Sequence, residues 1–117
     1  MPFTADLQFS PVETVLVKLL HERAMYGYEI IKVVNDRTDG AFQWKEGTLY
    51  PCLHRLETAG VIAGEWRAGA FGKRRKYYAL TGKGAALVQA RLDEWAAFSA
   101  AMDALLFAPE RGHPVRA

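Results

Sequence analysis

The chain has 117 residues, of which 50% are hydrophobic, so it is long enough for one domain with a modest core. Its 15 Lys and Arg side chains against 13 Asp and Glu leave a formal net charge of +2, which is too small to indicate a partner by itself. One cysteine, Cys52, excludes an internal disulfide, and no apolar run approaches the roughly 20 residues of a membrane span, so we expect a soluble cytoplasmic protein that does not enter a membrane.

The first predicted helix begins at "SPVE". Ser10 is a suitable N-cap, Pro11 fits the first helical position, and Glu13 would complete a capping box. The apolar residues that follow have helical spacing and should share one face: Val12, Val15, Leu16, Leu19 and Leu20. A second helix is predicted from about Tyr28 to Arg37, before the turn residues of "NDRTDGAF".

The third predicted helix lies in "EGTLYPCLHRLETAGVI" and contains a proline, Pro51. If Gly47 or Thr48 is the N-cap, Pro51 falls in the first turn, where its missing N–H costs little because those N–H groups have no partner in the helix. One side of the helix carries Leu49, Leu53 and Leu56, and the other sides carry Tyr50, Pro51, His54, Arg55 and Thr58. Gly60 is the expected stop.

After Gly60 the pattern changes to two strand-like segments, "VIAGEWRA" and "KRRKYYAL", joined by "GAFG", which together predict a hairpin. The second segment begins with four basic residues, Lys73 to Lys76, and strand alternation requires at least two of them to point away from the buried face. Thr81 is the expected cap of a long final helix that runs through Leu106, and a disordered tail should follow.

Three helices followed by a hairpin are typical of a winged helix-turn-helix, whose third helix enters the major groove of DNA while the hairpin lies along the backbone. The predicted fold class is therefore mainly α with a small β-hairpin and a long C-terminal helix. The predicted domains are an N-terminal arm (1–9), a winged helix-turn-helix DNA-binding domain (10–80), a dimerisation helix (81–107) and a disordered tail (108–117).

Phosphate contacts need cations and helix N-termini, and both occur at the start of the third helix and in the hairpin. The candidate DNA-binding residues are Lys45, Thr48, Tyr50, Pro51, His54, Arg55, Lys73, Arg74, Arg75 and Lys76. Simpler explanations exist: "KRRK" can be a solvated strand that protects a sheet edge, Tyr50 and His54 can form an ordinary exposed helix face, and Arg55 can pair with an acidic neighbour such as Glu57.

The last helix carries an apolar seam with alternating spacings of four and three, which is typical of two helices packing at a shallow angle. Its members are Val88, Leu92, Trp95, Ser99, Met102 and Leu106, with a second stripe of Leu87, Phe98, Ala101 and Leu105 beside it. One stripe can cover the chain's own domain, and the other needs a partner. We therefore predict a homodimer through Val88, Leu92, Trp95, Phe98, Ser99, Met102 and Leu106.

Three segments, "YGYEI", "EGTLYPCLHRLETAGVI" and "GKRRKYYALTGKG", resemble the signature segments of the PadR family of transcriptional regulators, and the resemblance covers about Ser10 to Leu106. It implies a winged helix-turn-helix with a C-terminal dimerisation helix, usually acting as a repressor on operator DNA. The short chain and the single final helix resemble the smaller branch of the family. Thr48, Tyr50 and Pro51 match the DNA-facing helix start, and Lys73 to Lys76 match the wing. The apolar "GAFG" stands where polar or acidic residues are common.

Some members of this family bind planar aromatic compounds between subunits, so the resemblance also implies a small aromatic effector. Trp95 is most simply an anchor of the core or of the dimer, but two such rings near a dimer axis can enclose a flat ligand. The candidate effector pocket consists of Val15, Lys18, Trp95, Phe98, Ser99 and Met102.

Catalysis and resident cofactors are not expected. His21, His54 and His113 fall in different segments without metal-ligand spacing, and Cys52 should be a buried, inert thiol. The predicted function is a homodimeric repressor of the bacterial cytosol, associated with the nucleoid when bound to a pseudo-palindromic site on double-stranded DNA. The alternative is a dimeric ligand-binding or protein-interaction module that has the winged fold without operator recognition; an RNA-binding role is disfavoured because the aromatic residues do not form a stacking platform.

Overall fold

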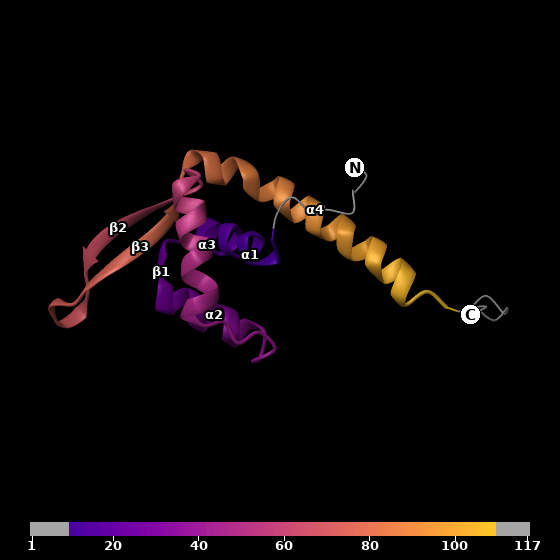
Figure 1. Cartoon of the computed structure of the whole chain (residues 1–117), viewed down its shortest axis with the longest axis horizontal. Coiled ribbons are helices and arrows are strands. Elements are labelled where there is room, and N and C mark those ends of the chain that lie inside the picture. Colours follow the sequence, from indigo (N-terminus) through magenta and orange to yellow (C-terminus); the bar gives the residue numbers. More distant parts are fainter. Residues whose placement is uncertain (1–9, 110–117) are drawn as a thin grey trace.

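The structure is a computed structural model that describes residues 10–109. Its elements in chain order are α1 (Pro11–Glu22), β1 (Met25–Tyr26), α2 (Gly27–Arg37), α3 (Glu46–Thr58), β2 (Ile62–Ala68), the 3₁₀ turn η1 (Ala70–Gly72), β3 (Arg74–Leu80) and α4 (Gly82–Leu106). Figure 1 shows the β2–β3 hairpin and α4 projecting in opposite directions from the three short helices. The predicted fold class is confirmed, while the predicted N-terminal arm and residues 110–117 of the predicted tail lie outside the described residues.

Two helices start at the predicted caps. The Ser10 hydroxyl accepts a hydrogen bond from the Glu13 N–H at 3.0 Å at the start of α1, and the Thr81 hydroxyl accepts one from the Gly84 N–H at 3.2 Å at the start of α4. Thr81 also donates to the Gly60 carbonyl at 2.6 Å. This side chain therefore joins the start of α4 to the end of α3, and fixes where the long helix leaves the domain.

The predicted start of α3 was wrong. Lys45 is the N-cap, and its carbonyl accepts from the N–H groups of Thr48 and Leu49 at 3.0 and 3.1 Å, so the helix begins two residues earlier than a Gly47 cap would allow. Pro51 consequently lies in the second turn and withholds a donor from the Gly47 carbonyl. Gly47 is exposed, so water can hydrate that carbonyl and the helix continues through the proline.

The end of α3 is set by two backbone hydrogen bonds. The Gly60 N–H donates to the Glu57 carbonyl at 3.0 Å, and the Val61 N–H donates to the Leu56 carbonyl at 2.9 Å. This is the Schellman arrangement, and the buried side chains of Val61 and Leu56 supply the apolar contact that usually accompanies it. The predicted stop at Gly60 is confirmed.

The sheet has three antiparallel strands in the order β1-β3-β2, of which β1 was not predicted. Strand β1 has only two residues, directly before α2, and pairs Met25 with Tyr78 and Tyr26 with Tyr77. A segment of two residues is too short to show an alternating pattern in a sequence. This strand brings the entry of α2 beside the base of the hairpin.

The core lies between α1, α2, α3 and the base of the sheet. Its most buried side chains are Leu16, Met25, Ile30, Leu49, Leu53 and Ile62. Cys52 is buried, as predicted, at 7% exposure. Only Gly84 and Val88 are buried in α4, because the first half of this helix packs beside α1 and the rest extends beyond the domain.

Glu22 at the end of α1 binds two cations. Its carboxylate accepts from the Arg37 guanidinium at 2.7 and 3.2 Å and from the Lys18 ammonium at 3.4 Å. The Arg37 hydrogen bond is the main reason that the pKa of Glu22 falls from 4.5 to about 2. The pair joins α1 to α2 at the domain surface.

We expect Glu22→Gln to lower the free energy of unfolding near neutral pH, by a small amount because water screens these partly exposed groups. The folded pKa of Glu22 lies below its unfolded value, so the stabilisation is complete above about pH 4.5 and disappears as the pH falls towards about 2. Urea unfolding midpoints of the two proteins should therefore converge in acid. A difference that persists unchanged at pH 2 would exclude this carboxylate as its source.

Candidate nucleic-acid interface

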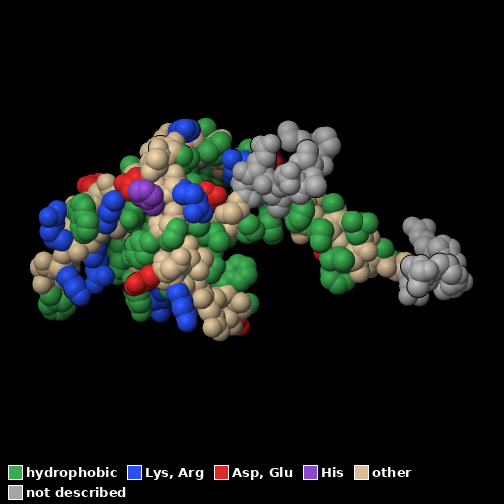
Figure 2. Space-filling model, in the orientation of Figure 1, with side chains coloured by type: hydrophobic (Ala, Val, Ile, Leu, Met, Phe, Trp, Pro, Cys, Tyr) green, Lys and Arg blue, Asp and Glu red, His purple; other side chains and the backbone are tan. Residues whose placement is uncertain are grey.

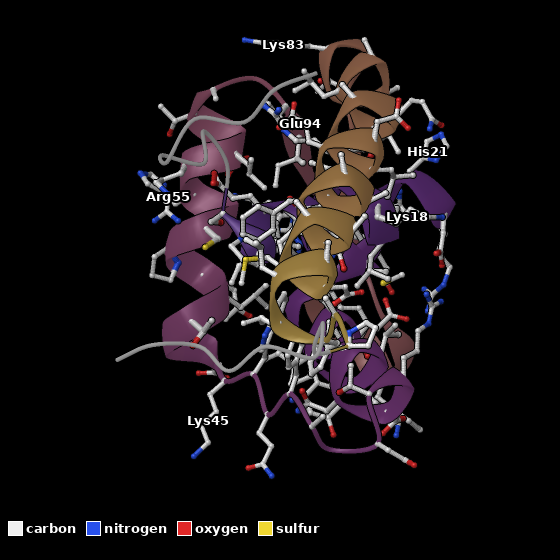
Figure 3. The ribbon with its side chains drawn as sticks, turned by 90° about the vertical axis from the view of Figure 1, so that its right-hand side faces the viewer. Lys18, His21, Lys45, Arg55, Lys83 and Glu94 are labelled. Atoms are coloured by element: carbon white, nitrogen blue, oxygen red, sulfur yellow. The ribbon has the colours of Figure 1, made fainter. Side chains whose placement is uncertain are left out.

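Helix α3 presents a polar, exposed side next to its buried leucines. Every predicted contact residue of this helix and its cap is exposed: Lys45, Thr48, Tyr50, Pro51, His54 and Arg55. Figure 3 shows Lys45 and Arg55 pointing away from the other helices. The alternation of buried and exposed residues along α3 thus gives a free surface on the helix that follows the α2–α3 turn.

The loop before α3 is fixed by one side chain of α2. The Asn35 carboxamide oxygen accepts from the Trp44 N–H at 2.9 Å, and its nitrogen donates to the Trp44 carbonyl at 3.4 Å. Lys45 follows directly and caps the exposed end of α3, where helical N–H groups favour anions. The Glu46 carboxylate in the first turn offsets part of this positive end.

Tyr50 lies on the side of α3 that faces the start of α2. Its ring passes so close to Gly27 that a Cβ added there would overlap the hydroxyl and lie 2.9 Å from the Tyr50 Cζ. Gly27 is buried, yet 43% of Tyr50 remains exposed. The lack of a side chain at position 27 therefore sets where the Tyr50 ring lies.

Arg55 does not form the ion pair considered for it. Its guanidinium donates to the Cys52 Sγ at 2.9 Å, and Glu57 instead binds Lys76 of β3. No ion pair within residues 10–109 includes Arg55. Its charge is therefore available to an external anion.

The hairpin register divides the wing cations between two faces. Trp66 pairs with Lys76 and Arg67 pairs with Arg75, so Arg74 and Lys76 share the face of Trp66, and Arg75 shares the opposite face with Arg67. Figure 2 shows Lys and Arg side chains gathered over this hairpin. The contiguous sequence "KRRK" consequently supplies charge to both sides of the wing.

Lys76 is already bound within the protein. Its ammonium lies 3.1 Å from the Glu57 Oε1, and the other carboxylate oxygen accepts from the Gly64 N–H at 3.3 Å. The hydrogen bond that Lys76 donates to Glu57 raises the pKa of Lys76 above its usual value. Of the four predicted wing cations, Lys76 is therefore the one whose charge is largely neutralised before any partner binds.

Three guanidinium groups of the wing lie over aromatic rings. The distances from the guanidinium carbon to the ring centroid are 4.5 Å for Arg75 over Tyr26, 4.6 Å for Arg67 over Tyr77, and 5.7 Å for Arg74 over Trp66. Such contacts restrict long side chains, so less conformational entropy is lost when their charged ends bind an anion.

Sequence reasoning did not identify Arg67 as a candidate. The alternation of side chains in "GEWRA" predicts that Arg67 and Trp66 point to opposite faces of the strand. Only the strand register shows that Arg67 lies beside Arg75 on one face of the wing. Tyr26 was missed for the same reason, since its contact with Arg75 depends on the pairing of β1 with β3.

An apolar groove of about 410 Å³ lies between α1, α2 and α4. Its lining includes Val15, Lys18 and Trp95 of the candidate effector pocket, together with Val34, Arg37, Phe42 and Leu92 among others. Phe98, Ser99 and Met102 do not line it, because they lie farther along α4. The Trp95 and Phe98 ring centroids are 5.7 Å apart, so the two parts of the candidate pocket adjoin.

The outer half of α4 carries exposed apolar side chains. The exposed fractions are 38% for Trp95, 37% for Met102, 81% for Leu105 and 62% for Leu106. In Figure 2 this part of α4 lies beyond the body of the domain. An apolar surface of this kind on a projecting helix favours contact with another apolar surface.

Other kinds of site find no support in the described part of the chain. Within residues 10–109, no group of three or more His, Cys, Asp or Glu side chains is placed to hold a metal ion. None of the helices described there has the length and apolar character needed to cross a bilayer.

Comparison with known proteins agrees with this geometry. The sequence model described as "Transcriptional regulator PadR-like family" matches residues 16–90. An uncharacterized protein of Lysinibacillus sphaericus is 36% identical over 92 residues, which cover 79% of this chain and 84% of that protein.

Solved structures are similar to this chain in both fold and sequence, and two of them illustrate the similarity. A transcriptional regulator from Clostridium thermocellum is 35% identical with a TM-score of 0.73, and the match covers 81% of this chain and 92% of that one. A PadR family transcription regulator from Clostridium difficile is 33% identical with a TM-score of 0.70, over 83% of this chain and 99% of that one. The chain therefore belongs to the PadR-like family of transcriptional regulators.

Proposed function

We propose that the protein is a homodimeric repressor that binds a pseudo-palindromic site on double-stranded DNA. The observation that carries the proposal is the exposed polar side of α3, on a PadR-type fold that also has a cationic wing. Such a protein would work in the bacterial cytosol, at the nucleoid when bound to DNA.

In the proposed complex α3 enters the major groove. Tyr50 and His54 are the candidates for contacts to base edges, and Pro51 lies between them at the exposed surface. Lys45, Thr48, Arg55 and the wing residues Lys73, Arg74 and Arg75 would contact phosphates. Phosphate contacts set affinity and register, whereas base contacts set specificity.

The apolar seam of α4 is the proposed dimer interface. Its residues are Val88, Leu92, Trp95, Phe98, Ser99, Met102 and Leu106, of which Val88 already packs within the chain. A two-fold axis through this helix would place two copies of α3 on successive turns of the major groove, about 34–36 Å apart. The two linked DNA-binding domains would then bind the two half-sites of one palindrome.

A small aromatic compound is the proposed effector. The groove beside Trp95 is apolar and large enough for such a molecule, and α4, which lines it, also carries the proposed interface. A ligand there would act only by preferring one spacing of the two α3 helices, because a ligand shifts an equilibrium between states that it binds unequally.

The proposal is tested by fluorescence anisotropy of a labelled duplex from the DNA upstream of the chain's own gene, with a shuffled duplex as control. Preferential, strongly salt-dependent binding that saturates at two chains per site is the expected result. Equal and weak binding to both duplexes would contradict recognition of this site. Elution from heparin at low salt, together with no duplex binding, would favour the alternative interaction module.

Arg75→Ala should weaken binding to every duplex. We expect the slope of log affinity against log salt to flatten by about 0.9 for each phosphate that the variant no longer neutralises. Lys76→Ala is the matched control on the same strand, because Lys76 is paired with Glu57 and should change the slope less. An unchanged slope for Arg75→Ala would show that this side chain does not reach the backbone.

A further inference from the structure

The tip of the wing exposes an aromatic ring. Phe71 is 105% exposed, more than any other large hydrophobic residue in the described chain, and it lies in the turn η1 between β2 and β3. Figure 1 shows this turn at the end of the hairpin, on the opposite side of the domain from the far end of α4. Burial in the chain's own core therefore does not account for a phenylalanine at this position.

The backbone at the tip does not favour a phenylalanine either. Phe71 has φ 61° and ψ 28°, a left-handed conformation that is unfavourable for a bulky residue and suits Gly or Asn. The turn is closed by the Gly69 N–H, which donates to the Lys73 carbonyl, and a Cβ on Gly69 would lie 2.7 Å from that same oxygen. The closed turn thus holds the ring outward at a cost in local stability.

The ring lies at the end of a positively charged hairpin. The outer part of the hairpin, residues 66–75, contains four cations and no acidic residue: Arg67, Lys73, Arg74 and Arg75. Lys73 and Arg74 are exposed, and contacts with aromatic rings restrict the three arginines. An apolar ring among cations matches the minor groove of a duplex, where phosphates line both edges and the base stack forms the floor.

We propose that Phe71 is a wedge that enters the minor groove and inserts between adjacent base pairs, bending the duplex beside the α3 contacts. The proposal rests on the proposed DNA-binding function and extends it to shape readout: flexible pyrimidine–purine steps under the wing are favoured over stiff A-tracts. A duplex suits the tip better than an anionic membrane. One ring in the short turn between Gly69 and Gly72 fills one base step, whereas interfacial anchoring to lipid needs a larger apolar face.

The test compares wild type with Phe71→Asn and Lys73→Ala on the upstream duplex, labelled at both ends for energy transfer. Asn removes the ring and suits the left-handed backbone, so Phe71→Asn should keep or raise the unfolding midpoint. We expect this variant to bind about tenfold more weakly with an unchanged salt slope, and to lose most of the bend. Lys73→Ala should instead flatten the slope and retain the bend.

A duplex with an A-tract in place of a TA step under the wing provides a second readout. Wild type should bind it more weakly than the TA duplex, and Phe71→Asn should bind the two equally. Equal affinity and equal bend for wild type and Phe71→Asn would overturn the wedge while leaving operator binding intact. Failure of wild type to bind any duplex would overturn both proposals. Phe71-dependent binding to phosphatidylserine vesicles in preference to DNA would assign the tip to a membrane.

Discussion

The double variant Met102→Glu/Leu106→Glu is expected to be monomeric and to lose most of its operator affinity. Both side chains lie on the proposed seam of α4 and are exposed in the single chain, so the domain core should remain intact. Two charges on each helix would face each other across the two-fold axis. Because linking two DNA-binding domains raises the affinity by about 10²–10⁴, the monomeric variant should lose more than a hundredfold in operator affinity. Sedimentation equilibrium and duplex anisotropy measure the two effects.

Ala97→Glu/Ala104→Glu is the matched control. Both alanines are exposed and lie on the side of α4 opposite the seam, so this variant adds the same charge to the same helix. It should remain dimeric and bind DNA nearly as well as wild type. Dissociation of both double variants would point to net charge or helix stability as the cause, and a monomeric wild type would refute the interface altogether.

Tyr50→Ala should weaken binding to the operator far more than binding to a shuffled duplex. A contact to a base edge contributes about 1–3 kcal/mol of discrimination, and a dimer would lose it in two half-sites. Tyr50→Phe separates the hydroxyl from the ring. Competition anisotropy with both duplexes measures the ratio of affinities, and an equal loss on both would assign Tyr50 to positioning rather than to specificity.

Gly27→Ala tests whether the position of the Tyr50 ring matters for this preference. A methyl group on residue 27 would overlap the Tyr50 hydroxyl and displace the exposed ring, without requiring a backbone shift. We therefore expect a loss of operator preference similar to that of Tyr50→Ala, with an unfolding midpoint close to wild type. Retained preference would mean that Tyr50 leaves Gly27 when it binds DNA.

Patterns confined to one segment were predictable from the sequence. Ser10 and Thr81 were predicted as caps because a Ser or Thr hydroxyl directly before a helical pattern can accept from the free N–H groups of the first turn. Both side chains make this hydrogen bond. The spacing of Leu49, Leu53 and Leu56 likewise predicted the buried side of α3. The wrong start of α3 also has a local cause. The prediction placed Pro51 in the first turn, but an exposed Gly47 carbonyl tolerates the missing N–H donor in the second turn.

The arrangement of the candidate interface was not predictable in this way. The sequence by itself determined the order of the four helices and the hairpin, the family and the presence of four wing cations, but not the two-residue strand β1. Tertiary structure decided that Lys76 pairs with Glu57, that Arg75 lies over Tyr26 and that Tyr50 lies over Gly27. Caps and stripes are set by neighbours within a few residues, whereas these contacts join different elements and depend on strand register and helix packing. The same charge can therefore be neutralised or available according to the partner that the fold places beside it.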